Sequence, residues 1–435
     1  QSTRQRASTK AVLPEPTGKA AAGTAANPGS QAAVTPRVLI GDRDFRRIWL
    51  AGGLGWMIRW LELLAIGVFT FEVTGSALMV ALMTMARSLP MLLFSAFTGA
   101  IADRIDRRLM LLCGLGLLAL SSGVLAFLAL TGRLELWHVA LGAFVSGIYG
   151  SLEFPVRRTM LGIIAGNKAG TGGAGVALTL DSATNHCMRL VGPILGGLII
   201  QSHGLPGVYI SSTLLFSLGF YLVWSARYQT AERAAAPRML VQIVEGLRYI
   251  RTNPRVMGTL YITIVVNLFG FPYVAMVPVI GAGVLGQNAT ATGLLLSSEA
   301  VGGLLGALAI ANFAKPRQFS RIFFIGAIVF LCAVFAFSLS RWYPLSLAVL
   351  FLSGLGVAGF AAMQSTIIFT SAPPEMRSRL MGVLAVCIGV NPIGVLQVGL
   401  LADWFGGATA VTIMTCEGLI GLLLAGLIWP HLRRR

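Results

Sequence analysis

The sequence predicts an all-α polytopic membrane protein with twelve transmembrane helices in two pseudo-symmetric six-helix bundles. Hydrophobic residues make up 56% of the 435 residues and charged residues 11%, whereas soluble domains carry about 25% charged residues. Apolar runs long enough to span a bilayer follow one another along the chain. The 33 lysines and arginines gather in alternate connections between these runs, which is typical of cytoplasmic loops.

Each predicted span has about 20 or more mostly apolar residues, the length that crosses a bilayer as a helix. The spans cover residues 47–73, 77–102, 109–131, 136–158, 173–202, 206–226, 256–284, 291–313, 321–340, 344–370, 378–402 and 407–430. The fifth span is the least regular, because Asp181, Asn185, His186 and Arg189 interrupt its apolar frame.

The long loop between the sixth and seventh spans divides the chain into two halves. We expect a disordered cytoplasmic tail over 1–45, a first bundle over 46–226, a cytoplasmic linker over 227–255, a second bundle over 256–430 and a basic cytoplasmic tail over 431–435. Residues 238–251 have the periodicity of a short surface helix. The tail has no apolar run of the kind found in signal peptides. Two six-helix halves joined by a midline linker are typical of internally repeated transporters.

The distribution of positive charge predicts the orientation. One set of connections holds nearly all the lysines and arginines that lie between spans, and the other holds only Arg133 and Arg341. Both termini are therefore expected in the cytoplasm of a bacterial-type plasma (inner) membrane. The net charge of +17 is spread over these loops, so we expect no nucleic-acid partner. The expected partners are the lipid bilayer, a small-molecule substrate and protons, with the chain acting as a monomer.

The short loop between the second and third spans has a G-x-x-x-D-R-x-x-R-R pattern. Its arginines would hold the loop on the cytoplasmic side. An aspartate at the membrane edge can also cap a neighbouring helix and pair with an arginine, which would make the loop a conformational latch. A simple topological anchor is the alternative. The pattern comprises Gly99, Asp103, Arg104, Arg107 and Arg108.

This loop resembles the signature loop of the major facilitator superfamily, and the resemblance covers roughly residues 42–430. It departs at Asp106, where glycine is usual. The resemblance implies that Glu153 pairs with Arg104 and that Asp103 faces the start of the eleventh helix near Pro374. These contacts would join the halves on the cytoplasmic side, and three independent surface charges are the alternative.

A second element, Gly192-Pro193-x-x-Gly196-Gly197 in the fifth span, resembles one associated with exporters of the superfamily. Glycines let helices approach closely, and proline removes a backbone hydrogen bond, so we expect a packing seam and a bending point here.

Four further, less specific motifs resemble the branch that holds enterobactin and macrolide exporters. They are Phe45-Arg-Arg, Thr74-Gly-Ser, Ala86-Arg-Ser-Leu-Pro90 and Phe154-Pro-Val-Arg157-Arg158. Proton-coupled drug exporters of the superfamily often carry an arginine inside the fourth helix, and none lies between His138 and Glu153.

Polar residues inside the spans are the candidates for binding substrate or protons, because a charged side chain at a helix centre costs about 2.5–3.5 kcal/mol. Arg59 and Glu62 are three residues apart, so they can pair with each other or line a cavity. Arg189 is a candidate for binding an anionic substrate, or for pairing with Asp181 or Glu62. The full set is Arg59, Glu62, Asp181, Asn185, His186, Arg189, Asn267, Glu299 and Asn391.

Two kinds of group in this set could carry a proton. Glu62 and Glu299 are the leading candidates, because burial raises the proton affinity of a carboxylate. His186 could titrate near neutral pH, although a lone histidine on a helix is more often simply hydrogen-bonded.

The sequence gives no support for an enzyme, a cofactor or a metal site. No G-x-x-x-x-G-K-[ST] loop is present to bind a nucleotide, and the five cysteines are single residues without metal-ligand spacing. The predicted function is secondary active transport by alternating access, with proton-coupled export of a small amphipathic molecule of the drug or siderophore class. The alternatives are an importer or lysolipid flippase of the same fold, and a non-transporting membrane sensor or scaffold.

Overall fold

The computed structural model describes residues 36–102, 106–169, 173–227, 248–250 and 253–430. These residues form helices joined by short connections, with no strand among them. The helices of the first half are α1 (Pro36–Gly41), α2 (Arg43–Thr74), α3 (Ala77–Ala102), α4 (Arg107–Leu130), α5 (Leu136–Ala169) and α6 (Gly173–Ser225). The second half contains α8 (Pro254–Val265), the π-helix η2 (Val266–Gly270), α9 (Tyr273–Gly283), α10 (Ala289–Phe313), the 3₁₀-helix η3 (Pro316–Gln318), α11 (Phe319–Leu339), α12 (Tyr343–Ser371), α13 (Pro374–Ile388), α14 (Asn391–Phe405) and α15 (Gly407–Ile428).

The described residues confirm the predicted twelve spans, six in each half. The 53-residue helix α6 holds two of them, because Gly204 turns the chain with φ 64° and ψ −165°, a conformation that favours glycine. In the second half, α8, η2 and α9 together form one span, and α13 and α14 form another. Ten helical segments are long and apolar enough to cross a membrane, and a shorter apolar stretch covers residues 77–93 of α3.

The predicted disordered tail is wrong for its last ten residues, because 36–41 form α1 and α2 begins at Arg43. The Asp42 side chain caps α2 by accepting hydrogen bonds from the backbone N–H groups of Asp44 and Phe45. Leu39 and Phe45 are fully buried against the first bundle, so this segment is held by packing. Residues 1–35, 431–435 and most of the predicted surface helix over 238–251 lie outside the described residues.

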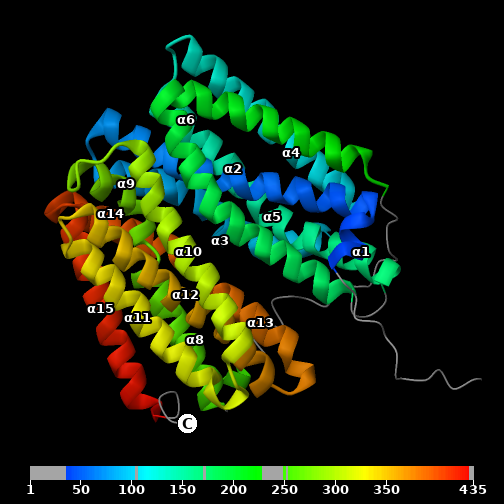
Figure 1. The fold of residues 1–435 in the computed structure, drawn as a ribbon, viewed down its shortest axis with the longest axis vertical. Helices are drawn as coiled ribbons and strands as arrows, with labels where there is room; N and C mark the ends of the chain where they lie inside the picture. The colour runs from blue at the N-terminus through cyan, green and yellow to red at the C-terminus, as the bar shows by residue number, and fades with distance from the viewer. Residues whose placement is uncertain (1–35, 103–105, 170–172, 228–247, 251–252, 431–435) are drawn as a thin grey trace, which may run out of the picture.

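The spans define two sides of the molecule. The side with the N-terminal ends of α2, α4 and α8 carries Arg107, Arg108, Lys168 and both ends of the described chain, and we call it the basic side. The opposite side, with residues 75–76, 131–135, 284–288 and 340–342, we call the far side. Figure 1 shows the helices of the two halves as two groups, which meet near α9 and α14 and diverge toward α1 and α13.

Small residues set the spacing between helices α10, α11 and α12 of the second half. At Gly302 in α10, an added Cβ would lie 1.9 Å from the carbonyl oxygen of Phe351 in α12. At Gly356, an added Cβ would lie 2.7 Å from the carbonyl oxygen of Gly326 in α11. Membrane helices that cannot gain from the hydrophobic effect associate through such close backbone contacts.

Candidate functional site

A cavity of about 580 Å³ lies between the two halves, within the size range of small-molecule sites. Its walls come from α2, α3, α5 and α6 of the first half and from η2, α9, α12, α13 and α14 of the second. The polar and aromatic residues that line it are Arg59, Trp60, Thr84, Arg87, Ser88, Ser151, Asn185, Arg189, Asn267, Phe271, Phe360, Gln364 and Asn391.

The halves pack directly against each other on the far side of this cavity. A Cβ added at Gly67 in α2 would lie 2.7 Å from the ring of Pro278 in α9. A Cβ added at Gly399 in α14 would lie 2.4 Å from the side chain of Ala81 in α3. Toward the basic side, Met91 lines the cavity and is 50% exposed. The cavity is therefore closed toward the far side and opens toward the basic side.

Helices α6 and α10 form the most extensive contact between the halves. A Cβ added at Gly293 in α10 would lie 2.4 Å from the carbonyl oxygen of Pro193 in α6. One turn further, the Ser297 hydroxyl donates a hydrogen bond of 2.7 Å to the carbonyl oxygen of Leu190. These contacts leave no room for a side chain or for water between the two backbones at this level.

The four residues of the Gly192–Gly197 element contact two different helices. A Cβ added at Gly196 would lie 2.6 Å from the carbonyl oxygen of Leu61 in α2, and Gly192 also faces α2. Gly197 instead faces α10, and the carbonyl group of Pro193 lies against the same helix. Among the described residues of α6, non-helical geometry is recorded at Gly204 alone, so bending at Pro193 stays a prediction.

An ion pair crosses from one half to the other at the cavity wall. A terminal guanidinium nitrogen of Arg189 in α6 lies 2.7 Å from a carboxylate oxygen of Glu299 in α10. Glu299 is 1% exposed, and the Arg189 guanidinium also lies over the ring of Trp60, 5.1 Å from its centroid. The partners predicted for Arg189, Asp181 and Glu62, are wrong. The sequence places Asp181 and Arg189 on one helix, whereas the close packing of α10 brings Glu299 to Arg189.

A second ion pair lies within the first half. Glu62 is buried and pairs with Arg87 of α3 at 3.6 Å, so the predicted pairing of Glu62 with Arg59 is wrong. The Arg59 guanidinium lies over the Trp56 ring, 5.1 Å from its centroid. It fills space that Gly150 leaves open, since a Cβ added there would lie 2.5 Å from the guanidinium. Arg59 therefore turns toward α5 and the cavity.

Asp181 belongs to a buried network on the basic side, away from the cavity lining. Arg157 in α5 donates hydrogen bonds to both Glu153 and Asp181, and Arg158 donates to Asp181 at 3.0 Å. Arg157 is 2% exposed and occupies a gap at Gly52, where an added Cβ would lie 2.4 Å from its guanidinium. This network joins α2, α5 and the first part of α6.

The predicted latch stays a prediction, because Asp103 and Arg104 lie outside the described residues. Glu153, the expected partner of Arg104, pairs with Arg157 in this structure. Arg107 is the first residue of α4, and Gly99 lies in α3. Arg108 donates from Nε to the carbonyl oxygen of Val223 at 3.3 Å, which ties the start of α4 to the end of α6.

Amide side chains line the cavity where two spans of the second half are interrupted. The seventh span contains the π-helix η2, and the eleventh is interrupted between α13 and α14. The Asn391 side chain donates to the carbonyl oxygen of Asn267 at 3.2 Å, and the Asn267 side chain donates to the carbonyl oxygen of Thr263 at 2.8 Å. π-Helical turns are frequent at functional sites.

The structure brings most of the predicted candidates to one place. Five of them line the cavity, and Glu62 and Glu299 pair with arginines that line it. Asp181 and His186 do not contribute to the lining. Arg87 was missed, although a single arginine in the middle of the apolar second span is the same signal that marked the other candidates. The five lining candidates are Arg59, Asn185, Arg189, Asn267 and Asn391.

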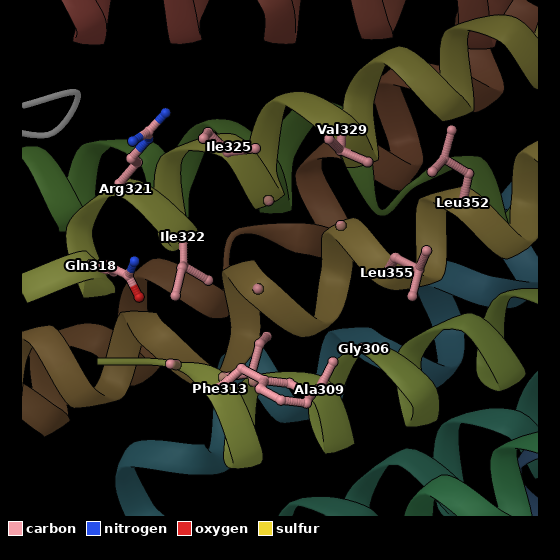
Figure 2. A pocket seen from close by; sticks show the side chains of 15 residues that line it. Gly306, Ala309, Phe313, Gln318, Arg321, Ile322, Ile325, Val329, Leu352 and Leu355 are labelled. Atoms are coloured by element: carbon pink, nitrogen blue, oxygen red, sulfur yellow. The ribbon is translucent and has the colours of Figure 1, made fainter. Parts of the chain in front are cut away.

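A second hollow, of about 720 Å³, is a groove on the outer surface of α10, α11 and α12. Figure 2 shows its apolar lining, with Arg321 and Gln318 toward one end. Leu352 and Ile325 in its walls are exposed, so the groove faces outward from the second half. None of the predicted site residues lines it.

A family model of the major facilitator type, described as transmembrane secretion effector, matches residues 38–433. The multidrug efflux pump Tap of Mycolicibacterium fortuitum is 28% identical over 82% of this chain and 89% of that protein. Macrolide efflux protein A of Streptococcus pyogenes is 21% identical over 83% and 90%. The staphyloferrin A transporter of Staphylococcus aureus is 19% identical over 82% and 88%.

Solved structures share the same architecture. The nucleoside transporter NupG superposes with a TM-score of 0.70 at 12% identity, covering 89% of this chain and 99% of that one. A POT family transporter superposes with a TM-score of 0.72 at 12% identity, covering 90% and 97%. At these identities the likeness establishes the fold alone.

Proposed function

Because the chain belongs to the transmembrane secretion effector family of the major facilitator superfamily and is a membrane transporter, we propose that it exports a small amphipathic molecule by proton-coupled alternating access. The observation that carries this proposal is the cavity between the halves, closed on the far side by direct helix contacts and open toward the basic side. Relatives named as multidrug, macrolide and siderophore transporters support export of this substrate class.

The basic side is the cytoplasmic side in this proposal, in the inner membrane of a bacterium. The concentration of lysine and arginine in its connections supports that orientation. The cavity then accepts its substrate from the cytoplasm. Export requires the far-side contacts between α6 and α10, α2 and α9, and α3 and α14 to separate while the basic side closes.

Proton coupling is proposed to act through Glu299. As a carboxylate, Glu299 holds α10 to α6 through Arg189. When the far side is open, a proton from outside neutralises Glu299, and release of that proton to the cytoplasm after the far side closes re-forms the pair with Arg189. Glu62 and Arg87 form a similar pair within the first half and are the second proposed proton site.

The proposal is tested by transport in proteoliposomes with an imposed pH gradient, over a panel of siderophores, drugs and lysolipids. We expect at least one compound to move opposite to the proton gradient, and its movement to stop when a protonophore collapses the gradient. Protein-free liposomes provide the control for leakage. If no compound moves with or against the gradient, proton-driven export of these classes is wrong.

The same assay separates export from its alternatives. An importer would move its substrate in the same direction as the protons. A lysolipid flippase requires a sideways opening that includes Arg189, and the outward-facing groove on α10, α11 and α12 does not include it. A sensor or scaffold would tolerate replacement of Arg189 or Glu299 and would instead depend on residues 1–40.

A further inference from the structure

Every charged side chain in the lining of the cavity, among the residues that the structure describes, is an arginine. Arg59, Arg87 and Arg189 contribute to the walls, and no carboxylate does. The nearest acidic partners, Glu62 and Glu299, are 5% and 1% exposed and lie behind the arginines with which they pair. A molecule that enters the cavity therefore meets positive charge first.

The positive charge of the site is not fully neutralised. Arg87 and Arg189 each have a carboxylate partner, whereas no carboxylate among the described residues lies within salt-bridge distance of Arg59. Three arginines and two glutamates leave one positive charge in excess. A charge inside a membrane span is costly unless it is paired or hydrated, so this position favours an anion.

The surroundings of Arg59 hold its guanidinium in place. The Trp56 ring lies under it, and the absence of a side chain at Gly150 gives it room against α5. A planar guanidinium fixed in this way offers parallel donors that match the two oxygens of a carboxylate. Arg59 is thus a cation without an acidic partner, held ready for an oxyanion.

The rest of the lining suits the body of an amphiphile. Trp60, Phe271 and Phe360 provide aromatic surface, and Asn185 and Gln364 provide amide hydrogen-bonding groups. From the charge and this lining together, we infer that the transporter selects organic anions, small molecules with a carboxylate or similar group on an aromatic or aliphatic body. This inference rests on the proposed function, to which it adds the charge of the substrate. A substrate cation of the same shape would be repelled by the excess positive charge.

Binding of three matched probes tests the inference. The probes are 1-naphthaleneacetate, 1-naphthaleneacetamide and 2-(1-naphthyl)ethylammonium, which share an aromatic body and differ in charge. They are titrated at pH 7 into the purified full chain in a neutral detergent by calorimetry. We expect the acetate to bind at least about tenfold more tightly than either other probe, equivalent to about 1.4 kcal/mol.

Two variants identify the source of this preference. Arg59→Gln is expected to remove most of it, because the variant loses the arginine without a carboxylate partner. Arg341→Gln removes the same charge from an exposed position on the far side and is expected to leave the preference intact. Equal binding of the three probes, tighter binding of the ammonium, absence of binding by all three, or an unchanged preference in Arg59→Gln would overturn the inference.

Failure here is distinguishable from failure of the proposed function, because binding requires no gradient and no transport. A chain that exports cations against a proton gradient would contradict the anion selectivity and leave the proposed function standing. A chain that prefers the acetate in calorimetry and moves nothing in proteoliposomes would contradict the proposed function and leave the anion selectivity standing.

Discussion

Replacing Glu299 with glutamine will abolish transport driven by a proton gradient while leaving the chain folded. Glutamine has nearly the same shape and can still hydrogen-bond Arg189, but it neither carries charge nor exchanges a proton. The contact of Arg189 with position 299, which ties α10 to α6, then no longer responds to protons. We expect gradient-driven export to fall by about 100-fold or more, equivalent to about 2.7 kcal/mol in the coupled step.

Exchange of substrate across proteoliposomes at equal pH separates loss of coupling from loss of folding. This exchange needs no net proton movement, so we expect Glu299→Gln to retain it. Glu417→Gln is the matched control, because Glu417 is also an acid within a span, pairs with Gln397 at 2.8 Å and does not line the cavity. Gradient-driven export that persists in Glu299→Gln would exclude Glu299 as the coupling group.

Replacing Arg157 with methionine will strongly destabilise the first half. The change leaves the buried carboxylates of Glu153 and Asp181 without their shared partner, and Arg158 can reach only the second of them. Removing one member of a buried ion network typically costs about 3–5 kcal/mol, because the remaining charge is buried without compensation. Thermal unfolding of the purified protein in detergent measures the loss.

A triple variant tests whether uncompensated charge is the cause. Arg157→Met combined with Glu153→Gln and Asp181→Asn is expected to recover most of the lost stability. Lys168→Met is the surface control, since the Lys168 side chain is 61% exposed and lies 3.1 Å from Asp42; exposed pairs contribute about 0–1 kcal/mol. If Arg157→Met unfolds at the same temperature as the natural chain, the network has no role in stability.

The spans were predictable from the sequence because the bilayer fixes the length of each apolar helix and concentrates lysine and arginine in the loops on one side. Both features can be read from a single sequence. Even the turn at Gly204 falls between two predicted spans. The helical segment before residue 46 was not predicted, because composition alone indicates a polar, flexible tail. In the structure this segment is ordered by the Asp42 cap of α2 and by the burial of Leu39.

The charged residues of the site were also visible in the sequence, but their partners were not. Helical spacing relates Arg59 to Glu62 and Arg189 to Asp181, because it describes one helix at a time. The observed partners come from other helices, Arg87 from α3 and Glu299 from the opposite half. The gap at Gly150 that draws Arg59 toward α5 depends on helix packing, which no local pattern encodes.

Separation of the halves on the far side during each transport cycle can be tested directly with a reversible cross-link there. The Thr290 hydroxyl of α10 donates to the side-chain oxygen of Gln201 of α6 at 2.5 Å, so cysteines at these two positions lie within reach of a short bis-methanethiosulfonate reagent that joins them through reducible disulfides. The pair is introduced into a variant whose five natural cysteines are replaced by serine. Ser338 and Thr412, 2.8 Å apart in α11 and α15 of one half, provide the control pair.

Transport in proteoliposomes is measured after cross-linking and again after reduction. We expect cross-linking of the Gln201→Cys/Thr290→Cys pair to stop transport and reduction to restore it, whereas the Ser338→Cys/Thr412→Cys pair should transport in both states. Undiminished transport with the Gln201→Cys/Thr290→Cys cross-link fully formed would contradict alternating access between these two halves.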